Sequence, residues 1–201
     1  MIVKPVLGTV LLWAMLALVS IAIAAEKRPK AQQFLHFGNM GGVMPDLKAT
    51  DLPEPNSEGA EYLRVFCSQC HNMPGPGMRT QKEWSRIYWD MYWRMHIMNS
   101  QFDNFLVPTY GQGDTLFKYL LRNALKPAKL TSIAQGEVGA TEYGRTCIQC
   151  HQLPDPRQHT SDEWPKVVQR MKRHMHSMGK IAPSKQEEKR IVTYLSSMAG
   201  K

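Results

Sequence analysis

The residues best suited to chemistry in this 201-residue chain are two short Cys-x-x-Cys-His motifs, which use all four of its cysteines. The motif residues are Cys67, Cys70 and His71, then Cys147, Cys150 and His151. Two thiols three positions apart, followed directly by an imidazole, are the pattern of covalent heme attachment, with the histidine as an iron ligand. We therefore expect two covalently attached heme c groups, held by the four cysteines, with His71 and His151 as metal ligands.

Other uses of four cysteines explain the motifs less well. A four-thiolate zinc site suits two Cys-x-x-Cys pairs, but it gives no reason for a histidine after each pair. A redox dithiol is typical of a single pair near a βαβ pattern, and this sequence has two pairs and no strand pattern. A disulfide within each motif would close a very small loop and add little stability. The sequence therefore favours heme over these three alternatives.

The motifs belong to an internal repeat. The second motif follows the first by 80 positions, and the same displacement relates Glu83-Trp84 to Glu163-Trp164 and Met91 to Met171. Two tandem copies of one module explain this better than one mixed domain. We predict one domain at residues 57–126, a linker at 127–135 and a second domain at 136–201, here called the first repeat and the second repeat. Copies this small need a cofactor or cross-link to hold a core.

The elements expected around the motifs are helices. Ser57 suits the cap of a helix that runs into the first motif. Thr80 and Thr160 each precede a glutamate by three positions, the capping-box pattern of a second helix. A third helix is expected over about 114–123 and, in the second repeat, 185–198. Because no segment alternates with period two, we predict an all-α fold of two small helical domains after an N-terminal hydrophobic helix.

The N-terminus predicts export from the cytoplasm. An apolar run from about Val6 to Ala25 follows Lys4 and ends abruptly at Glu26. Its Ala22-Ile23-Ala24 segment suits signal peptidase, yet the run is also long enough to span a bilayer. We therefore expect a signal peptide or membrane anchor at residues 1–25 and an irregular tether at 26–56. Both alternatives place the protein in the periplasm, either soluble or anchored to the inner membrane.

Each repeat resembles a small class I c-type cytochrome domain, with a heme-binding helix, a middle helix, a methionine-bearing region and a terminal helix ending in Tyr-Leu. The layout is similar to tandem diheme cytochromes c, although no Met-Pro dipeptide marks a sixth ligand. Some heme subunits of periplasmic dehydrogenases carry a tryptophan about two helical turns before a ligand methionine. Trp84 and Trp164 precede Met91 and Met171 in this way, so the resemblance implies Met91 and Met171 as metal ligands. The alternatives are Met95, Met98 and His96 in the first repeat, and Met175, Met178 and His176 in the second.

The resemblance implies an electron carrier that passes electrons between periplasmic or membrane redox partners and is not itself an enzyme. The alternative is the heme subunit of a periplasmic oxidoreductase or a peroxidase-like enzyme. The formal net charge of +8 favours redox protein partners with acidic docking surfaces, and residues 131–201 hold more of the basic excess than residues 51–130, with 11 Lys and Arg against 7 Asp and Glu. Export argues against nucleic acid as a partner, and no small-molecule substrate is expected. The inner membrane is a further partner if residues 1–25 are retained.

The two copies differ in the aromatic residues of the helix expected after Thr80 or Thr160. Trp89 and Trp93 lie on a different helical face from Trp84, and the second repeat has Gln169 and Arg173 in their places. We expect these two tryptophans to pack between the repeats, with a docking patch as the alternative.

Overall fold

The computed structural model describes residues 44–45, 47–102, 105–129, 133 and 136–199, which all belong to one compact unit. Regular structure in these ranges consists of six α-helices and three short 3-10 helices, with isolated β-bridges but no strand. The predicted all-α class is therefore confirmed for this part of the chain. The hydrophobic segment predicted at 1–25 lies outside the described residues, and none of the helices that are described has the length and apolar character needed to cross a bilayer.

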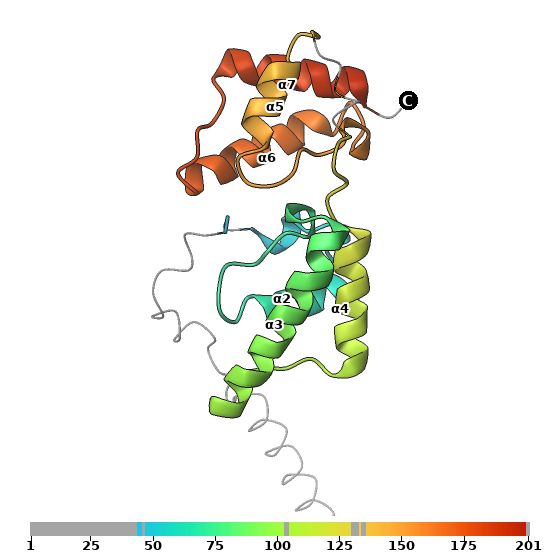
Figure 1. Ribbon diagram of the computed structural model, residues 1–201, viewed down its shortest axis with the longest axis vertical. Helices are drawn as coiled ribbons and strands as arrows, with labels where there is room; N and C mark the ends of the chain where they lie inside the picture. Colours follow the sequence, from blue (N-terminus) through green and yellow to red (C-terminus); the bar gives the residue numbers. More distant parts are fainter. Residues whose placement is uncertain (1–43, 46, 103–104, 130–132, 134–135, 200–201) are drawn as a thin grey trace, which may run out of the picture. The chain divides into compact units, whose positions relative to one another are not determined.

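The first repeat folds around helices α2 (Glu58–Cys67), α3 (Gln81–Gln101) and α4 (Tyr110–Arg122), with α4 packed against both of the others (Figure 1). Ser57 caps α2 as predicted, because its side chain accepts a hydrogen bond from the Ala60 N–H. Apolar side chains from all three helices form one buried core cluster, which includes Leu63, Trp84 and Leu116. This core holds the end of α2, and with it the first motif, against α4.

The second repeat contains α5 (Ala140–Cys147), α6 (Trp164–Ser177) and α7 (Lys185–Met198), and α7 packs against both α5 and α6 (Figure 1). Tyr143, Trp164 and Ile191 lie in a second core cluster, separate from the first. Each copy of the repeated sequence thus has a hydrophobic core of its own.

Two helix starts differ from the predictions. Helix α4 begins at Tyr110, four residues before the predicted start, because Thr109 and Gln112 form a capping box ahead of it. Helix α6 begins only at Trp164, although the Thr160 N–H donates to the Glu163 carboxylate as the capping pattern predicts. Pro165 lies in the first turn of α6, where its missing N–H costs no helical hydrogen bond.

Glycines allow a close approach between the first and last helices of each repeat. A Cβ atom on Gly59 would lie 2.3 Å from Tyr119 Cβ, and one on Gly139 would lie 2.2 Å from the Arg190 carbonyl oxygen. Gly139 also has a φ of +94°, in the left-handed region that side chains disfavour. The repeated glycine therefore sets how near α4 comes to α2 and how near α7 comes to α5.

The beginning of the predicted linker pairs with the second repeat. The Ala128 N–H donates to the Leu153 carbonyl at 2.7 Å, and the Asp155 N–H donates to the Lys126 carbonyl at the same distance. A β-bridge joins Pro127 and Pro154 between them. This short pairing ties the end of the first repeat to the segment that follows the second motif.

Candidate functional site

Each motif begins on the last residue of a helix. Cys67 ends α2 and Cys147 ends α5, so the rest of each motif forms the turn after the helix. Cys67 and Cys147 are partly buried and pack against the two core clusters, and burial raises the pKa of both thiols to about 12. Cys70 is exposed, and all four cysteines are free thiols. We call residues 67–71 and 147–151 the two Cys-His turns.

The histidines of the two Cys-His turns make the same local contact. His71 Nδ1 lies 2.7 Å from the carbonyl oxygen of Asn72, and His151 Nδ1 lies 2.7 Å from that of Gln152. A carbonyl oxygen only accepts hydrogen bonds, so Nδ1 of each ring is the donor. With Nδ1 engaged as a donor, Nε2 is the ring nitrogen left for a lone pair, which is the arrangement that a ligand nitrogen needs.

A repeated glutamine, which the motif analysis missed, fixes the loop opposite each Cys-His turn. Gln69 Nε2 donates to the Leu106 carbonyl at 3.0 Å, and the Leu106 N–H donates back to Gln69 Oε1 at 2.7 Å. Gln149 exchanges the same pair of hydrogen bonds with Ile181, at 3.0 and 3.2 Å. The only sequence signal was the glutamine shared by the two motifs. We call this pair of bonds the glutamine clamp.

A second contact holds the other side of each Cys-His turn. Trp84 Nε1 donates to the Pro76 carbonyl at 2.6 Å, and Trp164 Nε1 donates to the Pro156 carbonyl at 2.8 Å. Both indoles are buried, so each N–H needs this partner. The bond fixes the second helix of each repeat relative to the segment that follows the motif.

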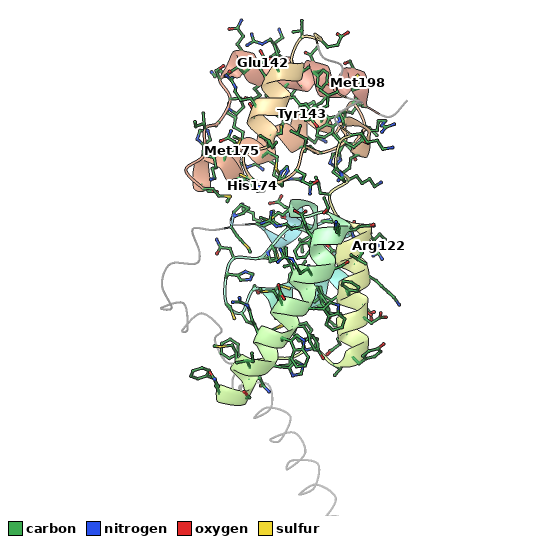
Figure 2. The ribbon with its side chains drawn as sticks, viewed as in Figure 1. Arg122, Glu142, Tyr143, His174, Met175 and Met198 are labelled. Carbon is green, nitrogen blue, oxygen red and sulfur yellow. The ribbon has the colours of Figure 1, made fainter. Side chains whose placement is uncertain are left out.

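A cavity of about 630 Å³ adjoins the second Cys-His turn. Its lining includes Cys147, Cys150, His151 and Met171, which are all the site residues predicted in the second repeat. The alternatives Met175 and Met178 line it as well. His176 is exposed and is not part of the lining, whereas His174, which the sequence analysis did not consider, is. His174 and Met175 lie together near the C-terminal end of α6 (Figure 2).

The cavity is basic. Four lysine or arginine side chains contribute to its lining, and Asp51 is the only acidic residue there. Burial, and then the neighbouring Arg170 charge, lower the pKa of His174. Lys172 is paired with Glu188 at 2.6 Å. The remaining positive charge suits a ligand or partner group that carries negative charge.

In the first repeat, the methionine nearest the core is not the one that the sequence favoured. Met95 is buried in the first core cluster, whereas Met91 and Met98 on the same helix are half-buried. His96 is exposed, and its ring lies 4.6 Å from that of Tyr92. Nothing in this arrangement distinguishes Met91 from Met98.

The predicted cofactor requires a correction. Among the described residues, no group of three or more His, Cys, Asp or Glu side chains is arranged to hold a metal ion. Cys67 packs against the core while Cys70 is exposed. The cysteine and histidine residues of the two turns therefore do not form a metal-binding group, and the prediction of two covalently attached heme c groups is wrong. The same observation gives no support to the zinc alternative.

No protein-family model, curated protein or solved structure matches the chain. The resemblance to c-type cytochromes therefore depends on the motifs and their repeat.

Proposed function

We propose that this chain is an exported electron carrier built from two helical domains that resemble class I c-type cytochromes. It passes electrons between redox partners in the periplasm or at the outer face of the inner membrane, and the two repeats contribute equally to this activity. The observation that carries the proposal is structural repetition. Both repeats have the same imidazole tautomer, the same glutamine clamp and the same tryptophan bond around the turn.

Burial of the thiols favours electron transfer over thiol–disulfide exchange. Exchange within a Cys-x-x-Cys pair involves both thiols, and the first thiol of each turn, Cys67 or Cys147, packs against core side chains, which leaves only Cys70 or Cys150 outside the core. The described residues also contain no strand on which a redox dithiol motif of the usual kind would sit. Polarisable methionine sulfur lines the cavity at the second turn, which suits a soft, apolar redox environment.

Charge indicates the type of partner. The chain has a formal net charge of +8, and the cavity beside the second Cys-His turn is lined by basic side chains. An acidic redox protein would be attracted to this part of the molecule, so its association rate should fall as salt is added. A neutral or basic partner would show no such dependence.

The proposal is tested by redox titration of the full chain, produced in a bacterium that exports it, together with its intact mass. We expect reversible reduction in two steps, one for each repeat, and the intact mass records the composition of the chain that was titrated. Cys70→Ala should remove one step and Cys150→Ala the other. Ser68→Ala and Ile148→Ala, which change exposed positions of the same turns, are the matched controls and should keep both. A chain that accepts no electrons, or cysteine variants that titrate like the controls, would refute the proposal.

A second candidate function is the redox subunit of an enzyme, and one observation favours it. The cavity of about 630 Å³ beside His151 falls within the size range of small-molecule sites. Cyanide and hydrogen peroxide should leave the potentials of an electron carrier unchanged. An enzyme of the peroxidase-like kind would consume peroxide, and cyanide would inhibit it.

A further inference from the structure

The outer face of α3 carries large apolar side chains in contact with solvent. Trp89, Trp93 and Ile97 follow one another at intervals of four residues, which places them on one face of the helix. Their exposed fractions are 50%, 64% and 54%. Trp84 and Met95, on the opposite face, are buried in the first core cluster. The packing between repeats that the sequence predicted for Trp89 and Trp93 is therefore wrong.

The same face is basic toward the start of the helix. Lys82 and Arg86 precede Trp89 by seven and three residues, which continues the stripe along the helix. Both side chains are exposed, and neither forms an ion pair with a described residue. Asp90 is the one acidic residue at the edge of the stripe. The α3 outer face, comprising Lys82, Arg86, Trp89, Trp93 and Ile97, is thus basic at one end and aromatic and apolar at the other.

The second repeat shows that the fold does not require these side chains. The corresponding positions of the second repeat, 80 residues later, are Asp162, Lys166, Gln169, Arg173 and Ser177. None of them is apolar, although α6 occupies the same place in its repeat and buries Trp164 as α3 buries Trp84. Trp89 also contacts Phe117 of α4, whereas Trp93 and Ile97 extend the apolar stripe further into solvent. A contiguous exposed stripe that the other repeat lacks is a feature of an interaction surface.

A phospholipid bilayer matches this stripe in chemistry and in location. Tryptophan is enriched where a membrane meets water, and lysine and arginine side chains are attracted to anionic lipid headgroups. The apolar run that ends at Ala25 is long enough to span a bilayer. Eighteen residues separate it from Met44, the first described residue. Fully extended, that segment reaches about 60 Å, so an inserted run keeps the first repeat close to the lipid surface.

We propose that the α3 outer face contacts the anionic lipid surface of the membrane that holds residues 1–25. The proposal rests on the proposed function in its membrane-anchored form, in which residues 1–25 are retained. Because the anchor already holds the chain at the membrane, the contact is an intramolecular event. Three apolar and two basic side chains, which would bind a membrane only weakly on their own, then suffice to keep α3 on the lipid surface. The first repeat then faces the membrane, and the second repeat, which lacks the stripe, does not.

The test uses the full chain in nanodiscs of phosphatidylcholine and phosphatidylglycerol that contain a photoactivatable phospholipid. After irradiation, mass spectrometry measures lipid adducts on each peptide. We expect adducts on residues 1–25 and on residues 82–101. Trp93→Ser combined with Ile97→Ser should reduce the α3 adducts about tenfold, because both side chains gain by leaving water. Adducts on residues 1–25 should not change. Omission of phosphatidylglycerol should reduce only the α3 adducts, since Lys82 and Arg86 then lose their partners.

The matched control variant removes two exposed apolar side chains from the second repeat, by Val138→Ser combined with Ile181→Ser. Its α3 adducts should equal those of the unchanged chain. Adducts on residues 1–25 without adducts on α3 would overturn this proposal and leave the anchor intact. A chain without adducts on residues 1–25 would overturn both the anchor and the surface contact, while the redox titration still decides electron transfer. Protein cross-links from α3 to a redox partner, in place of lipid adducts, would identify a protein docking face and overturn the lipid contact.

Discussion

Replacement of Gly139 by alanine tests the close approach of α5 and α7. The new Cβ atom would lie 2.2 Å from the Arg190 carbonyl oxygen and 3.0 Å from Tyr194 Cβ. The oxygen belongs to the backbone of α7, so no side-chain rotation relieves the overlap. The two helices must therefore move apart, or the first turn of α5 must distort.

Two effects set how much the free energy of unfolding falls in Gly139→Ala. Overpacking of a tight contact costs about 1–3 kcal/mol. An alanine at a φ of +94° adds about 1–2 kcal/mol, because its Cβ approaches the following carbonyl oxygen. Together they lower the free energy of unfolding by about 3 kcal/mol, a large part of the 5–15 kcal/mol that is usual for a domain. In a domain this small, the melting temperature should fall by roughly 15 °C.

Urea unfolding followed by circular dichroism measures this difference. Gly144→Ala, in the same helix, is the matched control, because no atom lies within 4 Å of its added Cβ. That variant should be as stable as the unchanged chain or up to about 1 kcal/mol more stable, since alanine favours helix. Gly59→Ala has the overlap without the positive φ and should fall between the two. If Gly139→Ala and Gly144→Ala unfold at the same urea concentration, the close approach of the two helices does not exist.

Three further outcomes are expected. Gln69→Ala should speed hydrogen exchange at the Leu106 amide by about tenfold, because it removes a hydrogen bond worth about 1–1.5 kcal/mol; unchanged exchange would mean that the clamp does not hold the loop. Trp164→Phe should destabilise the second repeat by about 1–3 kcal/mol, seen in thermal unfolding, because it leaves the Pro156 carbonyl without its buried donor. Burial lowers the pKa of His159, so the unfolded chain binds more protons than the folded one as the pH falls through about 6.5. Stability should therefore fall between about pH 7 and pH 5, and His159→Gln should make that fall smaller in urea titrations; an identical pH profile would contradict this assignment.

Local sequence signals predicted most of the helices. The caps at Ser57 and Thr80 and the absence of strand periodicity predicted α2, α3 and the all-α class, because these depend on neighbouring residues alone. The start of α4 was placed four residues too late, because Gly111 and Gly113 suggest a loop while the Thr109 cap favours a helix. Its amphipathic packing against α2 outweighs the low helix propensity of the two glycines.

The candidate site was less predictable, because it depends on how distant side chains converge. The motif pattern identified Cys147, Cys150 and His151, which do line one cavity with Met171. It also predicted two heme groups, and this was wrong, because no group of three or more His, Cys, Asp or Glu side chains among the described residues is placed to hold a metal ion. Periodicity separated Trp93 from the core face correctly, but it carried no information on whether another part of the chain would cover it.

The paired contacts on both sides of each Cys-His turn have a consequence for binding. A glutamine joins the turn to the loop ahead of the last helix, and an indole joins the following segment to the middle helix. Neither contact uses a cysteine or the histidine, so occupation of the cavity need not break them. A guest in the cavity should therefore meet a preformed wall on the side of the second Cys-His turn and incur little of the entropy loss that accompanies ordering of a loop there. Affinity for a rigid guest is then governed by shape and charge. The heat capacity change on binding should reflect only the apolar surface, of guest and cavity wall together, that binding removes from water.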